Sequence, residues 1–599
     1  MPIKRLFLIS IVLSLLLLTH VSQAQTYNPQ DTFYKVRTLA GLVLMLQQKH
    51  QKPLQLPPVQ VEGDKHPRHE YQKALEVLSK INRYRQINQL GPVAVPPYPS
   101  RQVTANEVYE MIQRLITELR VLMDEDAFKQ AQKMAEKYVP IPAYFSRTHN
   151  YELLWRISKA FDPLLGVRGF TPSDVYGQTL IVLDAIRFLR TTQNITDMPP
   201  KPPRPDNKHP NHALQEAARL LQKIHQAERN LWMDAVEVPR IPKRVITPTE
   251  VYDQMQTIIA ELQRIKYRLG VERDLIEPPT HTHKTPSDVV QNLRWAQAAM
   301  PLFPLDKPLI QYDPQSLLKT PSDVYAIAEN ILHKLHAYKR FRGIRLRAQK
   351  APYIGGLQPR HVYQKTTEVL SKVVSLRQQV GLGASALPLY PMRPVTPSDV
   401  YQTMARLERE LDLIYKRSGM DIKDFTPKTY SDKVPSDVFH VVWTISYEMD
   451  TILGTQGQTP SDVYRMAVYL EHHAQQLAHK LGYDIEVTPP PFKPGLRPAD
   501  VIVKATELFY LIGDMKKRAG IFTAPPPIPP ANDPVTPTDV YNLVVVIAPE
   551  LIELEVHHGI REQVLYPAPF KDKTPSHVYQ KLETVRRLLH QVRYGGKDD

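Results

Sequence analysis

Apolar residues recur along this chain at steps of three and four positions, the spacing that places side chains on one face of an α-helix. Such stripes are found from one end of the sequence to the other, and polar segments that contain proline separate them. The members of one stripe are Val400, Met404, Leu407, Leu411 and Ile414. The pattern predicts a series of amphipathic helices.

A hexapeptide close to Thr-Pro-Ser-Asp-Val-Tyr comes immediately before each stripe. Its clearest copies begin at Thr171, Thr320, Thr396 and Thr459. Threonine is a good N-cap, proline is tolerated at the first helical position, and an acidic residue at the third position completes a capping box. Neighbouring copies, including the degenerate ones, are usually about 38 residues apart, and a fixed period of this length is typical of a repeat protein. In all, the sequence predicts sixteen helix starts.

The predicted helix stops are as regular as the starts. A glycine stands 23 positions after the capping residue in nine copies, and Asn194 holds that place after Thr171. Glycine and asparagine there are typical of the left-handed residue that ends a helix. These glycines are Gly169, Gly270, Gly343, Gly381, Gly419, Gly457, Gly482, Gly520 and Gly559. Each repeat is therefore predicted to form one helix of about 22 residues, roughly 33 Å long.

The segments between a stop and the next start are rich in proline, most densely at 199–205, 489–494 and 525–530. Such segments favour an extended conformation, which at about 3.1 Å per residue can run the full length of a helix. Neighbouring helices could be parallel with an extended return between them, or antiparallel with a meandering loop. The sequence leaves both arrangements open.

Short junctions divide the helices into fours. Only 25 positions separate Ser146 from Thr171, and Val434 from Thr459. We therefore expect an all-α tandem array of four four-helix units joined by extended proline-rich linkers. The units span residues 25–170, 171–319, 320–458 and 459–599, after a signal peptide at 1–24. The sequence at 66–73 returns at 358–365, 292 positions later, which indicates an ancestral duplication of a pair of units.

The N-terminus has the pattern of an export signal. Lys4 and Arg5 precede an apolar run, residues 6–18, and a small-residue cleavage site follows at 22–24. A run this short does not span a bilayer, which needs about 20 residues, although an uncleaved anchor is the alternative interpretation. No later stretch is long and apolar enough to span. We expect a periplasmic or secreted protein with no transmembrane segment in the mature chain.

Composition narrows the possible chemistry. The chain has no cysteine, and removal of Lys4 and Arg5 lowers its formal charge from +15 to +13. We found no serine-nucleophile elbow, glycine-rich phosphate loop or His-Glu-x-x-His motif. The 21 histidines are expected to be surface residues rather than metal ligands. We therefore expect neither catalysis, nor a cofactor, nor a metal. The hexapeptide tyrosine is expected to pack on a proline-rich segment, with sugar stacking as the alternative.

One cationic cluster is denser than its surroundings. It lies at the end of the ninth predicted helix and just beyond it, and Tyr338 and Phe341 are interleaved with it. Its cations are Lys339, Arg340, Arg342, Arg345, Arg347 and Lys350. The helix dipole accounts for part of this charge, and the rest suggests a site for an anionic partner.

These features together favour an exported, non-catalytic helical-repeat scaffold that binds an envelope component, either a protein or an anionic polymer. Nucleic acid is not an expected partner outside the cytoplasm. The alternative is a periplasmic ligand-binding or sensory protein with a small molecule in the core of a four-helix unit. The wholly apolar stripes count against that alternative. The sequence does not indicate an oligomeric state.

Overall fold

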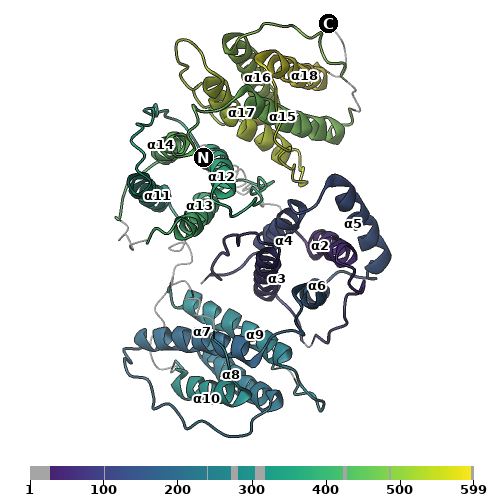
Figure 1. Cartoon of the computed structure of the whole chain (residues 1–599), viewed down its shortest axis with the longest axis vertical. Helices are drawn as coiled ribbons and strands as arrows, with labels where there is room; N and C mark the ends of the chain where they lie inside the picture. The colour runs from purple at the N-terminus through teal and green to yellow at the C-terminus, as the bar shows by residue number, and fades with distance from the viewer. Residues whose placement is uncertain are drawn as a thin grey trace, which may run out of the picture. The chain divides into compact units, whose positions relative to one another are not determined.

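The computed structural model describes residues 27–594, apart from 62, 100, 236, 239, 272–274, 276–280, 304–317, 422–427 and 484–486. Every regular element in these residues is a helix, which confirms the all-α class (Figure 1). The described part contains seventeen helices, so the predicted number of sixteen is wrong. The proposed signal peptide lies outside the described residues.

The helices that contact one another fall into four groups. Group 1 comprises α2 (Pro29–Lys49), α3 (Pro67–Ile87), α4 (Ala105–Arg120), α5 (Glu125–Tyr138) and α6 (Arg147–Leu165). Group 2 comprises α7 (Pro172–Thr191), α8 (Pro210–Asn230), α9 (Pro248–Arg268) and α10 (Pro286–Ala299). Group 3 comprises α11 (Pro321–Phe341), α12 (Pro359–Gln379), α13 (Pro397–Arg417) and α14 (Pro435–Leu453). Group 4 comprises α15 (Pro460–Lys480), α16 (Pro498–Arg518), α17 (Pro537–His557) and α18 (Pro575–Tyr594). Helices α2–α14 belong to one compact unit and α15–α18 to another.

The additional helix is α5, in the segment that links α4 to α6. This segment lacks the prolines of the other linkers from 124 to 138 and carries Ala127, Ala131 and Ala135 at helical spacing behind the N-cap Asp124. The α5 helix packs closely against α2, because Gly41 has no side chain to collide with the backbone of Ala131. It therefore replaces an extended linker with a helical one.

The predicted helix punctuation is largely confirmed. Thr171, Thr320 and Thr459 accept a hydrogen bond from the third residue of their helix and form capping boxes. Seven of the predicted stop glycines, and Asn194, have the expected positive φ at a helix end. The residue after each of these stops donates its amide to a carbonyl five positions back, as in Val271 to Lys266 and Ile344 to Lys339.

Two predicted stops are wrong. The helices α6 and α14 end three residues earlier, at the left-handed Gly166 and Gly454, and not at Gly169 and Gly457. Gly169 has a different reason to be glycine. It lies two residues before the cap of α7 with φ 111°, and a β-carbon there would collide with the Thr249 hydroxyl.

The four main helices of a group are parallel. This is one of the two arrangements that the sequence left open. In group 2, the residue before each helix cap donates its backbone amide to the polar side chain at the second position of a neighbouring helix. These hydrogen bonds are Phe170 to Thr249 (3.0 Å), Ile246 to Asn211 (3.1 Å), Lys208 to Ser287 (3.2 Å) and Lys284 to Ser173 (3.0 Å). They link α7, α9, α8 and α10 in a closed ring, so all four helices start at the same end.

The other groups have the same arrangement. In group 3, whose helices are seen nearly end-on in Figure 1, Lys319, Leu357 and Lys433 donate to Ser398, Ser436 and Ser322. In group 4, the first proline and the valine of all four helices line one small apolar cavity. In group 1, Lys65 at the start of α3 donates to Thr148 at the start of α6.

Extended segments return the chain from the end of one parallel helix to the start of the next. The segment 195–208 runs along α10, with Pro199 accepting from Trp295, Pro202 accepting from Gln291 and Arg204 pairing with Asp288. The hexapeptide tyrosines also contact such segments. The rings of Tyr176, Tyr325 and Tyr464 pack against those of His281, Tyr430 and Phe570. These rings belong to the segment that leads to the fourth helix and not to the one immediately preceding the tyrosine.

We expect the ring of group 2 to protect the amides that form it. Replacement of Ser287 by alanine removes the acceptor of the Lys208 amide, which costs about 1 kcal/mol and exposes that amide to exchange. Hydrogen exchange followed by mass spectrometry should show faster exchange at the start of α8. Ser79→Ala, at an exposed position of α3, is the control. Equal exchange in both variants would contradict a stabilising role for the ring.

Candidate functional site

The predicted cationic cluster does not form one site. Lys339, in the last turn of α11, is buried, and its ammonium lies 2.5 Å from the Glu448 carboxylate of α14. It also donates to the backbone oxygen of Leu346 at 2.8 Å. Lys339 therefore holds α11, α14 and the return segment together, and it is not available to a partner.

The other five cations, Arg340, Arg342, Arg345, Arg347 and Lys350, are exposed. Arg342 caps α11, and its guanidinium lies over the Tyr338 ring at 5.9 Å. Apolar surface is exposed beside them, since Phe341 is 51% exposed and Leu346 63% exposed. We call the exposed residues 340–350 the basic segment. It begins in the last turns of α11 and continues into the return that runs along α14.

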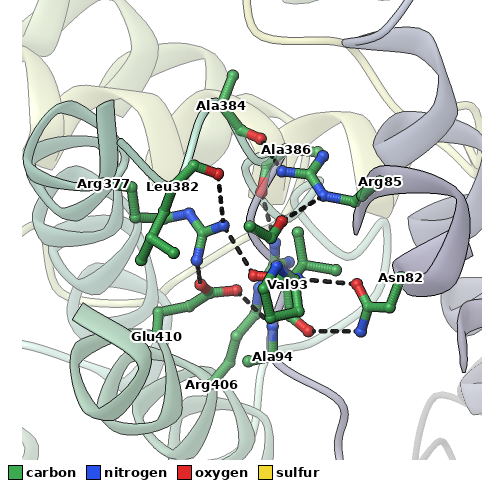
Figure 2. Close-up of polar contacts among 12 residues, drawn as sticks. Asn82, Arg85, Val93, Ala94, Arg377, Leu382, Ala384, Ala386, Arg406 and Glu410 are labelled. Atoms are coloured by element: carbon green, nitrogen blue, oxygen red, sulfur yellow. Dashed lines mark hydrogen bonds and ion pairs between the residues drawn. The ribbon is translucent and has the colours of Figure 1, made fainter. Parts of the chain in front are cut away.

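A second cluster of charged residues lies where group 1 contacts group 3, and the sequence analysis did not single it out (Figure 2). Arg377 of α12 forms a buried ion pair with Glu410 of α13 at 2.5 Å. Glu410 also accepts from the backbone amide of Ala94, and Arg377 donates to the backbone oxygen of Pro92. Side chains of group 3 thus bind the loop that follows α3.

The same contacts occur in the opposite direction. Arg85 donates to the backbone oxygen of Ala384, and Glu118 accepts from the backbone amide of Ala386 at 3.1 Å. Each of these residues lies 292 positions before its counterpart (377 minus 85, 410 minus 118). The contact is therefore pseudo-two-fold symmetric. The duplication was visible in the sequence, but it gave no sign that the two copies bind each other.

A third cluster of charged residues is buried between α3 and α9. Glu261 is fully buried and receives Arg68 at 2.7 Å, His69 at 2.9 Å and Arg264 at 2.8 Å. Burial holds the pKa of His69 down at about 4, so this imidazole is neutral. Burial and the neighbouring Glu261 charge raise the pKa of Glu228, which is therefore protonated beside an ionised Glu261. Because both carboxyl groups are sealed from solvent, they have no access to a substrate.

Lysine and aspartate continue this cluster. The Lys73 ammonium lies 2.6 Å from both Glu76 and Asp253, and Tyr151 donates to Asp253 at 2.6 Å. Burial opposes ionisation of Asp253, but the Lys73 charge prevails and lowers the pKa of this carboxyl. The arrangement joins α3 and α6 of group 1 to α9 of group 2 through satisfied charges.

The fold and these clusters define a class: an all-α protein of parallel helix groups, of which group 1 contacts groups 2 and 3 through buried charged residues. No protein-family model, curated protein or solved structure matches the chain. In the described residues no helix is long and apolar enough to cross a membrane. No group of three or more histidine, aspartate or glutamate side chains placed to hold a metal ion is found within those residues either.

Loss of Glu410 should destabilise the contact between groups 1 and 3. Glu410→Ala leaves Arg377 buried without its ion-pair partner, which costs about 3 kcal/mol. Glu118→Ala should have a comparable effect, because it occupies the symmetric position. Denaturant unfolding of the full chain measures both. Glu125→Ala, which removes an exposed ion pair with Arg120, should change stability by less than 0.5 kcal/mol or so.

Glu70 should make stability depend on pH. Burial raises the pKa of this carboxyl to about 7, above its ordinary value of 4.5, although Arg147 lies 3.2 Å away. The unfolded chain loses this proton at lower pH than the folded chain, so stability falls as pH rises from about 4.5 to 7. Glu70→Gln should remove up to about 3 kcal/mol of that decline. Unfolding midpoints at several pH values test this, with Glu125→Gln as the control. A decline that persists in Glu70→Gln would contradict it.

Proposed function

We propose that this chain is an exported, non-catalytic scaffold that binds an anionic component of the cell envelope through the basic segment. The observation that carries the proposal is the exposure of five cations within eleven residues, 340–350, next to the exposed Phe341 and Leu346. Charges needed only to balance the α11 dipole would lie in its last turn. Arg345, Arg347 and Lys350 lie beyond it.

The scaffold part of the proposal rests on repetition. We propose that the chain is organised as four tandem units of four main helices, 25–170, 171–319, 320–458 and 459–599, with α5 as an additional helix of the first unit, joined by proline-rich returns. The parallel helices and their apolar stripes support this organisation. Each unit presents outer helix faces and an extended return on its surface, and such surfaces are suited to binding other macromolecules.

Ligand binding in the core of a unit is less well supported. The stripes that face each core are apolar and closely packed. Met255, Ile258 and Leu262, for example, are fully buried. A small-molecule site requires convergent polar groups in a cavity. A cleft with polar lining lies between groups 1 and 2, whereas polar side chains buried within a group, such as His473 and Glu555 at 2.6 Å, pair with each other.

The basic segment should account for salt-dependent binding to anionic polymers. The probe is immobilised polygalacturonate, with neutral dextran as the blank, and isolated cell envelopes as the native target. Replacing Arg340, Arg342, Arg345 and Arg347 together by serine should weaken binding on the order of tenfold at low salt and flatten its salt dependence. Helical circular dichroism should be unchanged, because these side chains are exposed.

The matched control removes four exposed lysines from elsewhere, by replacing Lys52, Lys129, Lys133 and Lys137 with serine. It changes net charge equally but leaves the basic segment intact. Equal loss in both variants would mean that net charge alone drives the binding. Salt-insensitive binding would exclude the electrostatic mechanism.

A further inference from the structure

A cleft lies beside the buried charges that join groups 1 and 2. Its walls come from α3 and α6 on one side, α8 and α9 on the other, and from the described return residues 60–61, 63–65, 237 and 240–246. The space within it is about 90 Å³ and opens to solvent. This space holds several waters, or one edge of a small molecule.

Two hydrogen-bond donors on the cleft wall have no partner among the described residues. They are the indole nitrogen of Trp155 in α6 and the amide nitrogen of Gln254 in α9. Each residue is only 7% exposed. A buried donor without a partner is unfavourable, and native proteins rarely leave one unless water or a ligand satisfies it.

Of the three tryptophans at this helix position, Trp155 and Trp443 have an indole nitrogen that is unpaired within the described chain, and Trp295 has a paired one. Trp295 holds the corresponding place in α10, and its indole nitrogen donates to the backbone oxygen of Pro199 at 2.7 Å. There a return segment supplies the acceptor. At Trp155 the cleft takes the place of that acceptor.

The charges around the donors select the kind of ligand. Asp253, next to Gln254, is ionised and already paired with Lys73 and Tyr151. The carboxylates of Asp64 and Glu237 line the more exposed part of the cleft. Lys65, Arg240 and Arg244 also line the cleft, and Arg244 is paired with Glu250. Asp253 nevertheless directly precedes the donor Gln254 in the sequence, so a ligand carboxylate at the donors would meet its negative charge. A hydroxyl group avoids this conflict, because it accepts from Trp155 or Gln254 and donates to a neighbouring carboxylate.

We propose that this cleft binds a neutral polyhydroxylated small molecule, a monosaccharide or polyol, whose hydroxyl oxygens accept from Trp155 and Gln254. The carboxylates of Asp253, Glu237 and Asp64 accept hydrogen bonds from the hydroxyl groups. The site is independent of the basic segment, which belongs to group 3.

The test titrates D-glucose and myo-inositol into the full-length protein and records the heat of binding and the tryptophan fluorescence. Trp155→Phe keeps an aromatic ring but removes the donor, and Gln254→Leu removes the second donor with little change in volume. Each should weaken binding about tenfold, the effect of one lost hydrogen bond in a buried site. Trp295→Phe is the matched control and should bind as the parent does. Circular dichroism verifies that the variants remain folded.

Other results would overturn the proposal. These are no binding of either probe, or binding that Trp155→Phe and Gln254→Leu both leave unchanged. Stronger binding of acetate or glycine than of the sugars, lost in Gln254→Leu, would show an acidic or zwitterionic ligand and would also overturn it. The serine variant of the basic segment should bind the sugars normally, so failure here and failure of the envelope-binding proposal can be distinguished.

Discussion

The parallel alignment of helices within a group is the constraint on which the rest of the structure depends. Four parallel helices place four positive dipole ends together, an arrangement that repels itself. The chain offsets this with an acidic residue in the first turn of most helices, such as Asp174, and with basic residues in the last turn of many, such as Arg190. It then fixes the starts to one another through polar side chains at the second helical position. The serine of the hexapeptide thus joins one helix start to the next.

Parallel helices also require long returns, and this explains the proline content. A return must cover a helix of 21 residues, about 31 Å, in an extended conformation without forming a helix of its own. Proline secures that conformation and removes amide donors that would need partners. The return then packs along a helix with its remaining carbonyls accepting from side chains, as Pro199 and Pro202 do. The α5 helix shows the other solution, in which a stretch without proline, 124–138, returns as a helix against Gly41.

Much of this could be predicted because it is local. Caps, boxes and left-handed stops depend on residues within one or two turns, so the positions of Thr171 or Gly343 were evident in the sequence. The orientation of the helices depends on hydrogen bonds between distant segments, such as that of Lys284 with Ser173, 111 residues apart, and no local pattern encodes them. The cationic cluster was found from its composition. That Lys339 is not an exposed member of it could not be predicted, because its burial depends on Glu448 of another helix. Only the folded chain shows that the indole nitrogen of Trp155 is unpaired at a cleft.

The contacts between groups depend on two helix positions that were copied in the duplication. In groups 1 and 3 these positions hold an arginine and a glutamate, Arg85 with Glu118 and Arg377 with Glu410, and the two groups bind each other's loops symmetrically. In group 2 the equivalent positions, 143 residues after those of group 1, hold Glu228 and Glu261. Two carboxyl groups cannot offer the donors that Arg85 and Arg377 supply to a loop. They accept hydrogen bonds instead, and Arg68 and the neutral His69 of α3 both contact Glu261 in this way. One change from arginine to glutamate therefore distinguishes a group that pairs with its own duplicate from one that binds α3, without any change in the helices themselves.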